Sequence, residues 1–93
     1  MAIVTTLSSC VLRPVPCFSV MEDGKMKVHE EVHFNASCTA NATSFSWDFG
    51  DGSSAAGLST KHKYDYSANF IVTLTAIRAN KSESSTQVLT IEN

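Results

Sequence analysis

One short segment of this 93-residue chain carries acids and glycines at a spacing that could do chemistry: WDFGDG, residues 47–52. Two chemistries fit such a pattern. A DFG triplet holds magnesium in protein kinases, and an aspartate followed by an Asp-Gly pair occurs in calcium loops. The structural alternative is a turn, in which Asp48 and Asp51 accept hydrogen bonds from backbone N–H groups while Gly50 and Gly52 adopt positive φ.

Length and spacing argue against both chemical interpretations. A protein kinase does not fit in 93 residues, and its lysine strand, catalytic loop and glycine-rich loop are missing from the sequence. An EF-hand loop needs an oxygen ligand at its third position, which is Gly50 when Asp48 is counted as the first. The segment is therefore predicted to be a turn. A calcium site of another kind, built from Asp48, Asp51 and carbonyl groups, is the alternative.

The other titratable side chains form no catalytic set. His29 and His33 have the spacing of a helical zinc pair, but on an extended strand they would lie about 13 Å apart. No serine lies in a G-x-S-x-G elbow. We therefore expect no catalytic residue, no metal and no cofactor, and the chain is predicted not to be an enzyme.

The elements that must position this turn are short strands. Segments in which apolar and polar residues alternate recur along the chain, and turn residues separate them, which is typical of a sandwich or barrel. These segments are an edge strand in 17–28 that turns at Asp23-Gly24, followed by 31–38, 44–49, 69–79 and 85–92. The turns between them are TANAT, GDGSSAAGLS and NKSES. Six or seven such strands predict an all-β domain of two packed antiparallel sheets.

Alternation also predicts which side chains are buried, because successive side chains of a strand point to opposite faces. Trp47 should lie in the core between Phe45 and Phe49, which share its face. The inner face of the last strand is either Leu89 and Ile91 or Val88 and Thr90. The other predicted inner residues are Val32, Phe34, Ala36, Cys38, Phe70, Val72, Leu74 and Ala76.

Composition limits the remaining classes. Hydrophobic residues make up 43% and charged residues 17% of the chain, as in an ordinary globular domain. A net charge of -2 gives no basic surface for nucleic acid. No apolar run approaches the roughly 18–20 residues that span a membrane. We expect residues 1–16 to be a lead-in or edge segment and residues 17–93 to form the domain.

The segments SFSWDFGDGSS and KHKYDYSANFIVTLTA together resemble the PKD domain, the polycystic kidney disease repeat of polycystin. That family carries an aromatic-x-W-D-F-G-D-G segment, then H-x-Y, then G-x-Y-x-V-x-L-x-V. Ala68 and Phe70 depart from the pattern, which usually has glycine and tyrosine there. A turn at Ala68-Asn69, with Asn69 in the left-handed region, would compensate for the missing glycine. The matching positions are Trp47, Asp48, Phe49, Gly50, Asp51, Gly52, His62, Tyr64, Phe70, Val72 and Leu74.

The resemblance implies an immunoglobulin-like β-sandwich of about seven strands in an extracellular region, where such domains act as spacers, force-bearing links or binding surfaces. The expected partners are neighbouring domains of the same ectodomain and protein ligands, with no nucleic acid and no direct membrane insertion. We expect a monomeric domain within a larger, membrane-anchored cell-surface protein. Two alternatives stay open: a carbohydrate-binding accessory module of a secreted hydrolase, and a calcium-dependent adhesion domain.

Three residues near this motif have specific expected roles. Tyr64 occupies the place of a tyrosine corner, whose hydroxyl bonds back to the main chain. His62 is predicted to be a structural histidine that bonds a carboxylate or backbone group near the Asp48 turn. Tyr66 lies in a predicted turn and should be exposed.

Three acceptor sequences for N-glycosylation support an extracellular location: Asn35-Ala36-Ser37, Asn41-Ala42-Thr43 and Asn80-Lys81-Ser82. Asn35 should point away from the core, because its neighbours point inward. Asn41 and Asn80 fall in predicted loops. All three side chains are therefore expected to face solvent and to be able to carry glycan.

The cysteines leave the disulfide pairing open. Cys10, Cys17 and Cys38 form an odd set, so at most one bond forms within the chain. A Cys17–Cys38 bond follows if the first two strands pair antiparallel. The alternatives are a Cys10–Cys17 bond and three free thiols with Cys38 buried.

Overall fold

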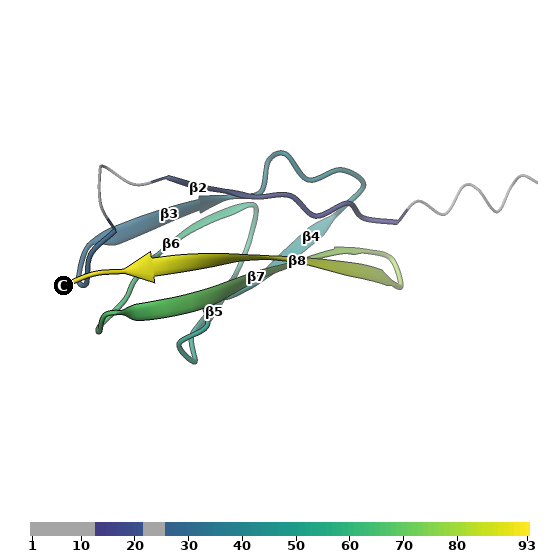
Figure 1. Ribbon diagram of the computed structural model, residues 1–93. Helices are drawn as coiled ribbons and strands as arrows, with labels where there is room; N and C mark the ends of the chain where they lie inside the picture. Colours follow the sequence, from purple (N-terminus) through teal and green to yellow (C-terminus); the bar gives the residue numbers. More distant parts are fainter. Residues whose placement is uncertain (1–12, 22–25) are drawn as a thin grey trace, which may run out of the picture.

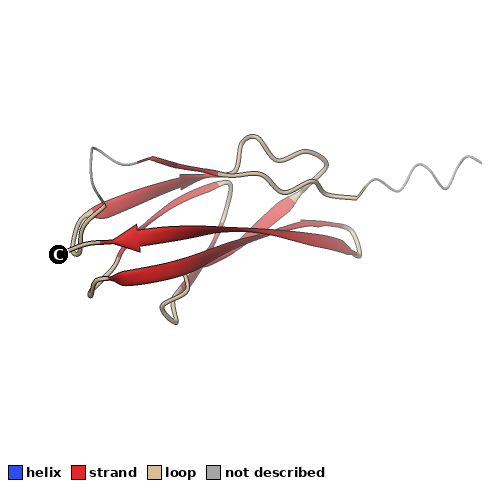
Figure 2. Ribbon diagram, viewed as in Figure 1, coloured by secondary structure: helices blue, strands red, loops and turns tan. Residues whose placement is uncertain are grey.

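The computed structural model describes residues 13–21 and 26–93, which fold into seven strands without a helix (Figures 1 and 2). The strands pair into two antiparallel sheets, one of order β2-β3-β6 and one of order β5-β4-β7-β8. The predicted all-β fold of two antiparallel sheets is therefore confirmed. The strands are β2 Ser19–Met21, β3 Glu31–Asn35, β4 Ser44–Asp48, β5 Ser54–Ala56, β6 Ser59–Lys63, β7 Ala68–Arg78 and β8 Lys81–Ile91.

The core lies between the two sheets and is built by alternation. On β7 every second side chain from Phe70 to Ala76 is buried, as predicted. On β8 the inner residues are Leu89 and Ile91, because they pair with Phe70 and Ala68 on the inner side of β7, and Val88 is 66% exposed. The buried cluster consists of Phe18, Val32, Phe34, Ala36, Trp47, Phe49, Tyr64, Phe70, Val72, Leu74, Leu89 and Ile91.

The longest element is the β7–β8 hairpin, which is paired without interruption from Ala68↔Ile91 to Arg78↔Lys81. Its loop is only the pair Ala79-Asn80, with Ala79 at φ +53°. Two expectations were wrong here. Residues 81–84 of the predicted turn NKSES belong to β8, because a two-residue loop suffices for a hairpin. Asn69 is not left-handed but lies inside β7, opposite Thr90, whose hydroxyl donates to its Oδ1 at 2.7 Å.

Two strands were not predicted: β5, whose three residues Ser-Ala-Ala are too few to show alternation, and β6, whose sequence Ser-Thr-Lys-His-Lys is polar throughout. The segment GDGSSAAGLS was expected to be a turn, yet it contains β5 and the first residue of β6. β5 pairs with β4, which places Ala55 opposite Trp47. β6 pairs with β3, which places His62 opposite Val32. Hydrogen bonding to the partner strands β4 and β3 therefore makes these segments strands, although their own sequences show no strand pattern.

A disulfide joins Cys17 to Cys38, with the two Cα atoms 5.3 Å apart. The bond holds the N-terminal segment against the chain that follows β3, where Val15 and Ala40 also exchange backbone hydrogen bonds. Cys38 was expected on the inner face but is exposed, because β3 ends at Asn35 and a turn follows. Cys10 and the expected Asp23-Gly24 turn lie outside the described residues.

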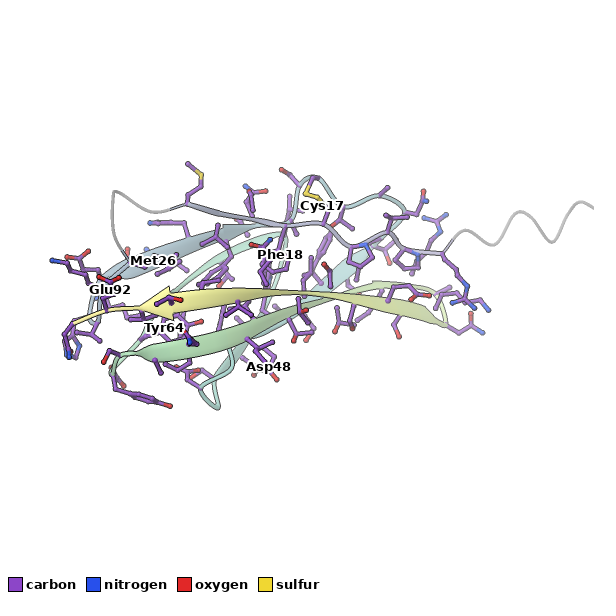
Figure 3. All side chains as sticks on the ribbon, viewed as in Figure 1. Cys17, Phe18, Met26, Asp48, Tyr64 and Glu92 are labelled. Atoms are coloured by element: carbon purple, nitrogen blue, oxygen red, sulfur yellow. A yellow bond between two sulfur atoms is a disulfide. The ribbon has the colours of Figure 1, made fainter. Side chains whose placement is uncertain are left out.

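The described chain begins and finishes at opposite ends of the sandwich (Figure 1). At one end, Arg13 forms a 2.6 Å ion pair with Glu83 near the tip of the hairpin. At the other, the Glu92 N–H donates to Met26 O at 3.0 Å, and the two residues lie side by side in Figure 3. The chain thus crosses the full length of the domain between entry and exit.

Candidate functional site: the WDFGDG turn

The acids of the WDFGDG segment bond to their own backbone. Asp48 Oδ1 accepts the Gly50 N–H at 2.9 Å, and Asp51 Oδ1 accepts the Ser53 N–H at 3.1 Å. Each bond spans two residues, which is the geometry of an Asx turn. The Phe49 N–H adds a backbone bond to Ser53 O at 3.1 Å. The segment therefore closes a tight connection between β4 and β5, as the turn interpretation predicted.

Gly50 sits where no other residue fits. Its φ is +85°, and a Cβ added there would lie 2.5 Å from the carbonyl oxygen of Ile71 on β7. Gly52 also has a positive φ, of +92°, but a Cβ added there meets no atom within 4 Å. The first glycine is thus required by close packing against the neighbouring strand, and the second by backbone conformation alone.

His62 of β6 connects the three-stranded sheet to this turn. Its Nε2 lies 2.7 Å from Asp51 Oδ2, and both side chains are mostly buried. Burial by itself would raise the pKa of Asp51, but the hydrogen bonds from His62 and the Ser53 N–H and the charge of His62 hold that pKa below its usual value. An ionised carboxylate only accepts hydrogen bonds, so the His62 Nε2 carries the shared proton.

Stacked rings extend this contact into the core. The imidazole of His62 lies parallel to the ring of Phe49, with centroids 4.3 Å apart, and meets Tyr64 edge-on at 4.7 Å. The fully buried Tyr64 hydroxyl donates to the Phe49 carbonyl at 2.9 Å. Burial, together with the nearby charges of Asp51 and Asp48, raises the pKa of Tyr64, so this hydroxyl keeps its proton. Tyr64 bonds back to the main chain as expected of a tyrosine corner.

Trp47 anchors the strand that leads into the turn. It is 1% exposed and contacts Phe18 edge-on and Phe34 at a tilt, with centroids 5.2 and 5.6 Å away. Its indole N–H donates to Gly57 O at 2.8 Å. The sequence predicted the burial of Trp47 but gave no sign of its backbone partner, because Gly57 lies in the unpredicted connection between β5 and β6.

The arrangement is suited to holding two sheets together. Each carboxylate oxygen of Asp51 already has a hydrogen-bond partner, Ser53 N–H or His62, so a calcium ion would have to compete with these bonds for the same oxygens. Within residues 13–21 and 26–93, no three His, Cys, Asp or Glu side chains come close enough to share a metal ion. No helix of the described chain is long and apolar enough to cross a membrane.

The remaining predicted residues lie apart from the turn. Asn35 is on the outer side of β3 and half-buried, Asn41 is half-buried in the loop before β4, and Asn80 is exposed at the hairpin tip. The expectation of fully solvent-facing side chains thus holds for Asn80 and is too simple for Asn35 and Asn41. Tyr66 is 57% exposed, as expected, and its ring touches Phe70 edge-on at 5.3 Å.

Comparison with known proteins places this geometry in a family. A family model described as PKD domain matches residues 13–92. No curated protein gives a significant match to the sequence.

Among solved structures, a carbohydrate-binding-module protein of the β-sandwich superfamily is 24% identical, with TM-score 0.79 over 87% of this chain and 35% of that one. The PKD1 domain of the Vibrio cholerae metalloprotease PrtV is 22% identical, with TM-score 0.74 over 88% of this chain and all of that domain. The PKD domain of the human VPS10 domain-containing receptor SorCS2 is 17% identical, with TM-score 0.65 over 86% of this chain and 75% of that one. At these identities the structures show the fold, and the family match over residues 13–92 shows that this chain belongs to the PKD domain family.

Proposed function

We propose that this domain is a non-catalytic spacer in a larger extracellular, cell-surface protein, where it carries tension between its two ends and presents its faces to neighbouring domains or protein ligands. Domains of the PKD family are generally non-catalytic modules. The Cys17–Cys38 disulfide supports an oxidising, extracellular compartment. The three glycosylation sequences point the same way.

The proposal rests on the load path, which is the route by which tension would pass through the domain from residue 13 to residue 93. Along the backbone, tension entering at residue 13 reaches the Cys17–Cys38 bond before the first strand, and only the Arg13–Glu83 ion pair and the Val15–Ala40 bridge are loaded earlier. The bond passes the load to Cys38, so β2 and β3, which lie within the covalent loop, are bypassed. Tension leaving at residue 93 pulls along β8, which is held by β7 over its whole length and by residues 26–28 at its end.

A pulling experiment tests this path. The bond closes a sequence separation of 21 residues. At about 3.3–3.6 Å per extended residue, the closed loop prevents about 70 Å of chain from extending under load. In a Cys10→Ser background, the domain stretched between its two ends should gain about 70 Å of extra unfolded length when Cys17 and Cys38 are also changed to serine. Equal unfolded lengths for the two proteins would overturn the proposed path.

A carbohydrate-binding accessory module is the second candidate, because the carbohydrate-binding-module structure matches with TM-score 0.79. Such modules use exposed aromatic rings, and among the described residues Tyr66 is the one aromatic side chain that is more than half exposed. Titration with soluble polysaccharides, read by the intrinsic fluorescence of the domain, tests it. Saturable binding that is lost in Tyr66→Ala would favour this candidate over the spacer, and no binding would remove it.

A further inference from the structure

We propose that Asn80, at the tip of the β7–β8 hairpin, is an N-glycan acceptor that stays accessible in the folded domain, and that together with Asn41 it makes the entry end of the sandwich a glycan-bearing end. The inference rests on the extracellular placement proposed above. It also distinguishes the three acceptor sequences by their accessibility, which the amino-acid sequence alone does not show.

Asn80 has the geometry of a free acceptor. It is the second residue of a two-residue loop, it is exposed, and no hydrogen bond among the described residues uses its side chain. Ser82, which completes the acceptor sequence, is exposed on β8. The loop marks the end of the sheet, so a glycan on Asn80 Nδ2 extends into solvent without displacing a packed group.

Asn41 lies at the same end but is more confined. The Thr43 N–H donates to Ile77 O at 2.8 Å, which holds the loop containing Asn41 beside the hairpin. Asn41 Nδ2 is 3.5 Å from Arg13 O, at the limit of a hydrogen bond. A glycosylated amide keeps one N–H, so this contact is compatible with the modification, and the glycan would begin beside Arg13.

Asn35 differs from both. Its Oδ1 accepts the Ser37 N–H at 2.7 Å, and Ala36, the middle residue of the acceptor sequence, is fully buried with its N–H bonded to Leu58 O. The sequence is followed directly by the disulfide at Cys38. Asn35 is thus half-buried beside a fixed backbone, so we expect modification there mainly before folding.

None of the three acceptor sequences lies at the opposite end of the domain. The Asx turns at Asp48 and Asp51, the exposed Tyr66 and Glu92 lie on connections or strand ends that contain none of the three asparagines. Glycans on Asn41 and Asn80 would crowd the entry end and direct protein contacts toward the exit.

Secretion from eukaryotic cells tests the inference, with a control acceptor sequence placed in an appended tag. Glycopeptide mass spectrometry should find glycan on Asn80. Endoglycosidase should release that glycan from the native, disulfide-intact protein as fast as the tag glycan, and should release the Asn41 glycan more slowly. Reduction and denaturation should abolish the difference. An unmodified Asn80 beside a modified tag, or slow native release from Asn80, would overturn the inference.

Two serines on the same strand provide a matched control. Ser82→Ala destroys the acceptor sequence while keeping Asn80, whereas Ser84→Ala changes an exposed serine outside it. The first variant should lose the mass of one glycan and the second none. Loss of the glycan in both would count against the assignment. Retention of the parent chain inside the cell would count against the extracellular proposal, and a secreted domain with a bare Asn80 counts against this inference alone.

Discussion

The two glycines of the WDFGDG turn should differ in what they tolerate, and the difference can be worked out from the structure. Both have positive φ, which costs an L-residue about 1–2 kcal/mol. A Cβ on Gly50 also lies 2.5 Å from Ile71 O and 3.0 Å from Ile71 N, on a strand paired on both sides. Moving that backbone adds about 1–3 kcal/mol. We therefore expect Gly50→Ala to lose about 2–5 kcal/mol of unfolding free energy, and Gly52→Ala about 1–2 kcal/mol.

Urea unfolding followed by the fluorescence of the buried Trp47 measures both losses. Gly52→Ala is the matched control, because it shares the positive φ and lacks the contact. Equal losses would mean that β7 yields easily at Ile71 and that close packing does not explain Gly50. A larger loss in Gly52→Ala would show that the second glycine has a role that its open surroundings do not reveal.

Three further predictions concern the His62 cluster and the calcium alternative. Tyr64→Phe leaves the buried Phe49 carbonyl without its donor and should cost about 1–3 kcal/mol, and an unchanged urea midpoint would contradict the bond seen at 2.9 Å. The folded pKa of Asp51 is depressed, so its contribution to stability is present above its unfolded pKa, about 3.9, and is lost as pH falls through the folded value. Melting temperature should therefore fall more steeply in acid for the parent than for Asp51→Asn, and parallel curves would refute this. Millimolar calcium should not change the melting temperature, and a rise that disappears in Asp51→Asn would restore the calcium-dependent adhesion alternative.

The sequence predicts the parts of the fold whose own side chains carry the signal. Trp47 lies between Ser46 and Asp48, and Leu74 between Thr73 and Thr75, so burial on one face follows from the pattern alone. The Asx turns are predictable as well, because Asp48 and Asp51 bond within two residues of themselves.

What the sequence could not predict depends on contacts between distant segments. β6 has no apolar alternation, and only pairing with β3 makes it a strand. His62 contacts Asp51 and not Asp48, because the backbone conformation of the turn determines which carboxylate faces β6. The sequence named the Cys17–Cys38 bond on the condition that the first two strands pair antiparallel; the register that meets this condition, with Ser19 opposite Asn35, could not be read from the cysteines themselves.

The expected boundary between residues 16 and 17 stays a prediction, although the described part of the preceding segment already touches the domain. Val15 pairs with Ala40, and Arg13 reaches Glu83. The family model likewise begins at residue 13. Removal of residues 13–16 should therefore lower stability through the loss of these contacts.

The direction of pulling tests the central claim, that the domain carries tension between its ends. Hydrogen bonds of an antiparallel pair run perpendicular to the strands, so force along β8 loads them together, whereas force that separates Ile91 from Ala68 breaks them one pair at a time. Handles at residues 13 and 93 should therefore give an unfolding force several-fold above that from handles at Ser67 and Asn93, measured on the same disulfide-intact protein. Equal forces in the two directions would contradict the account.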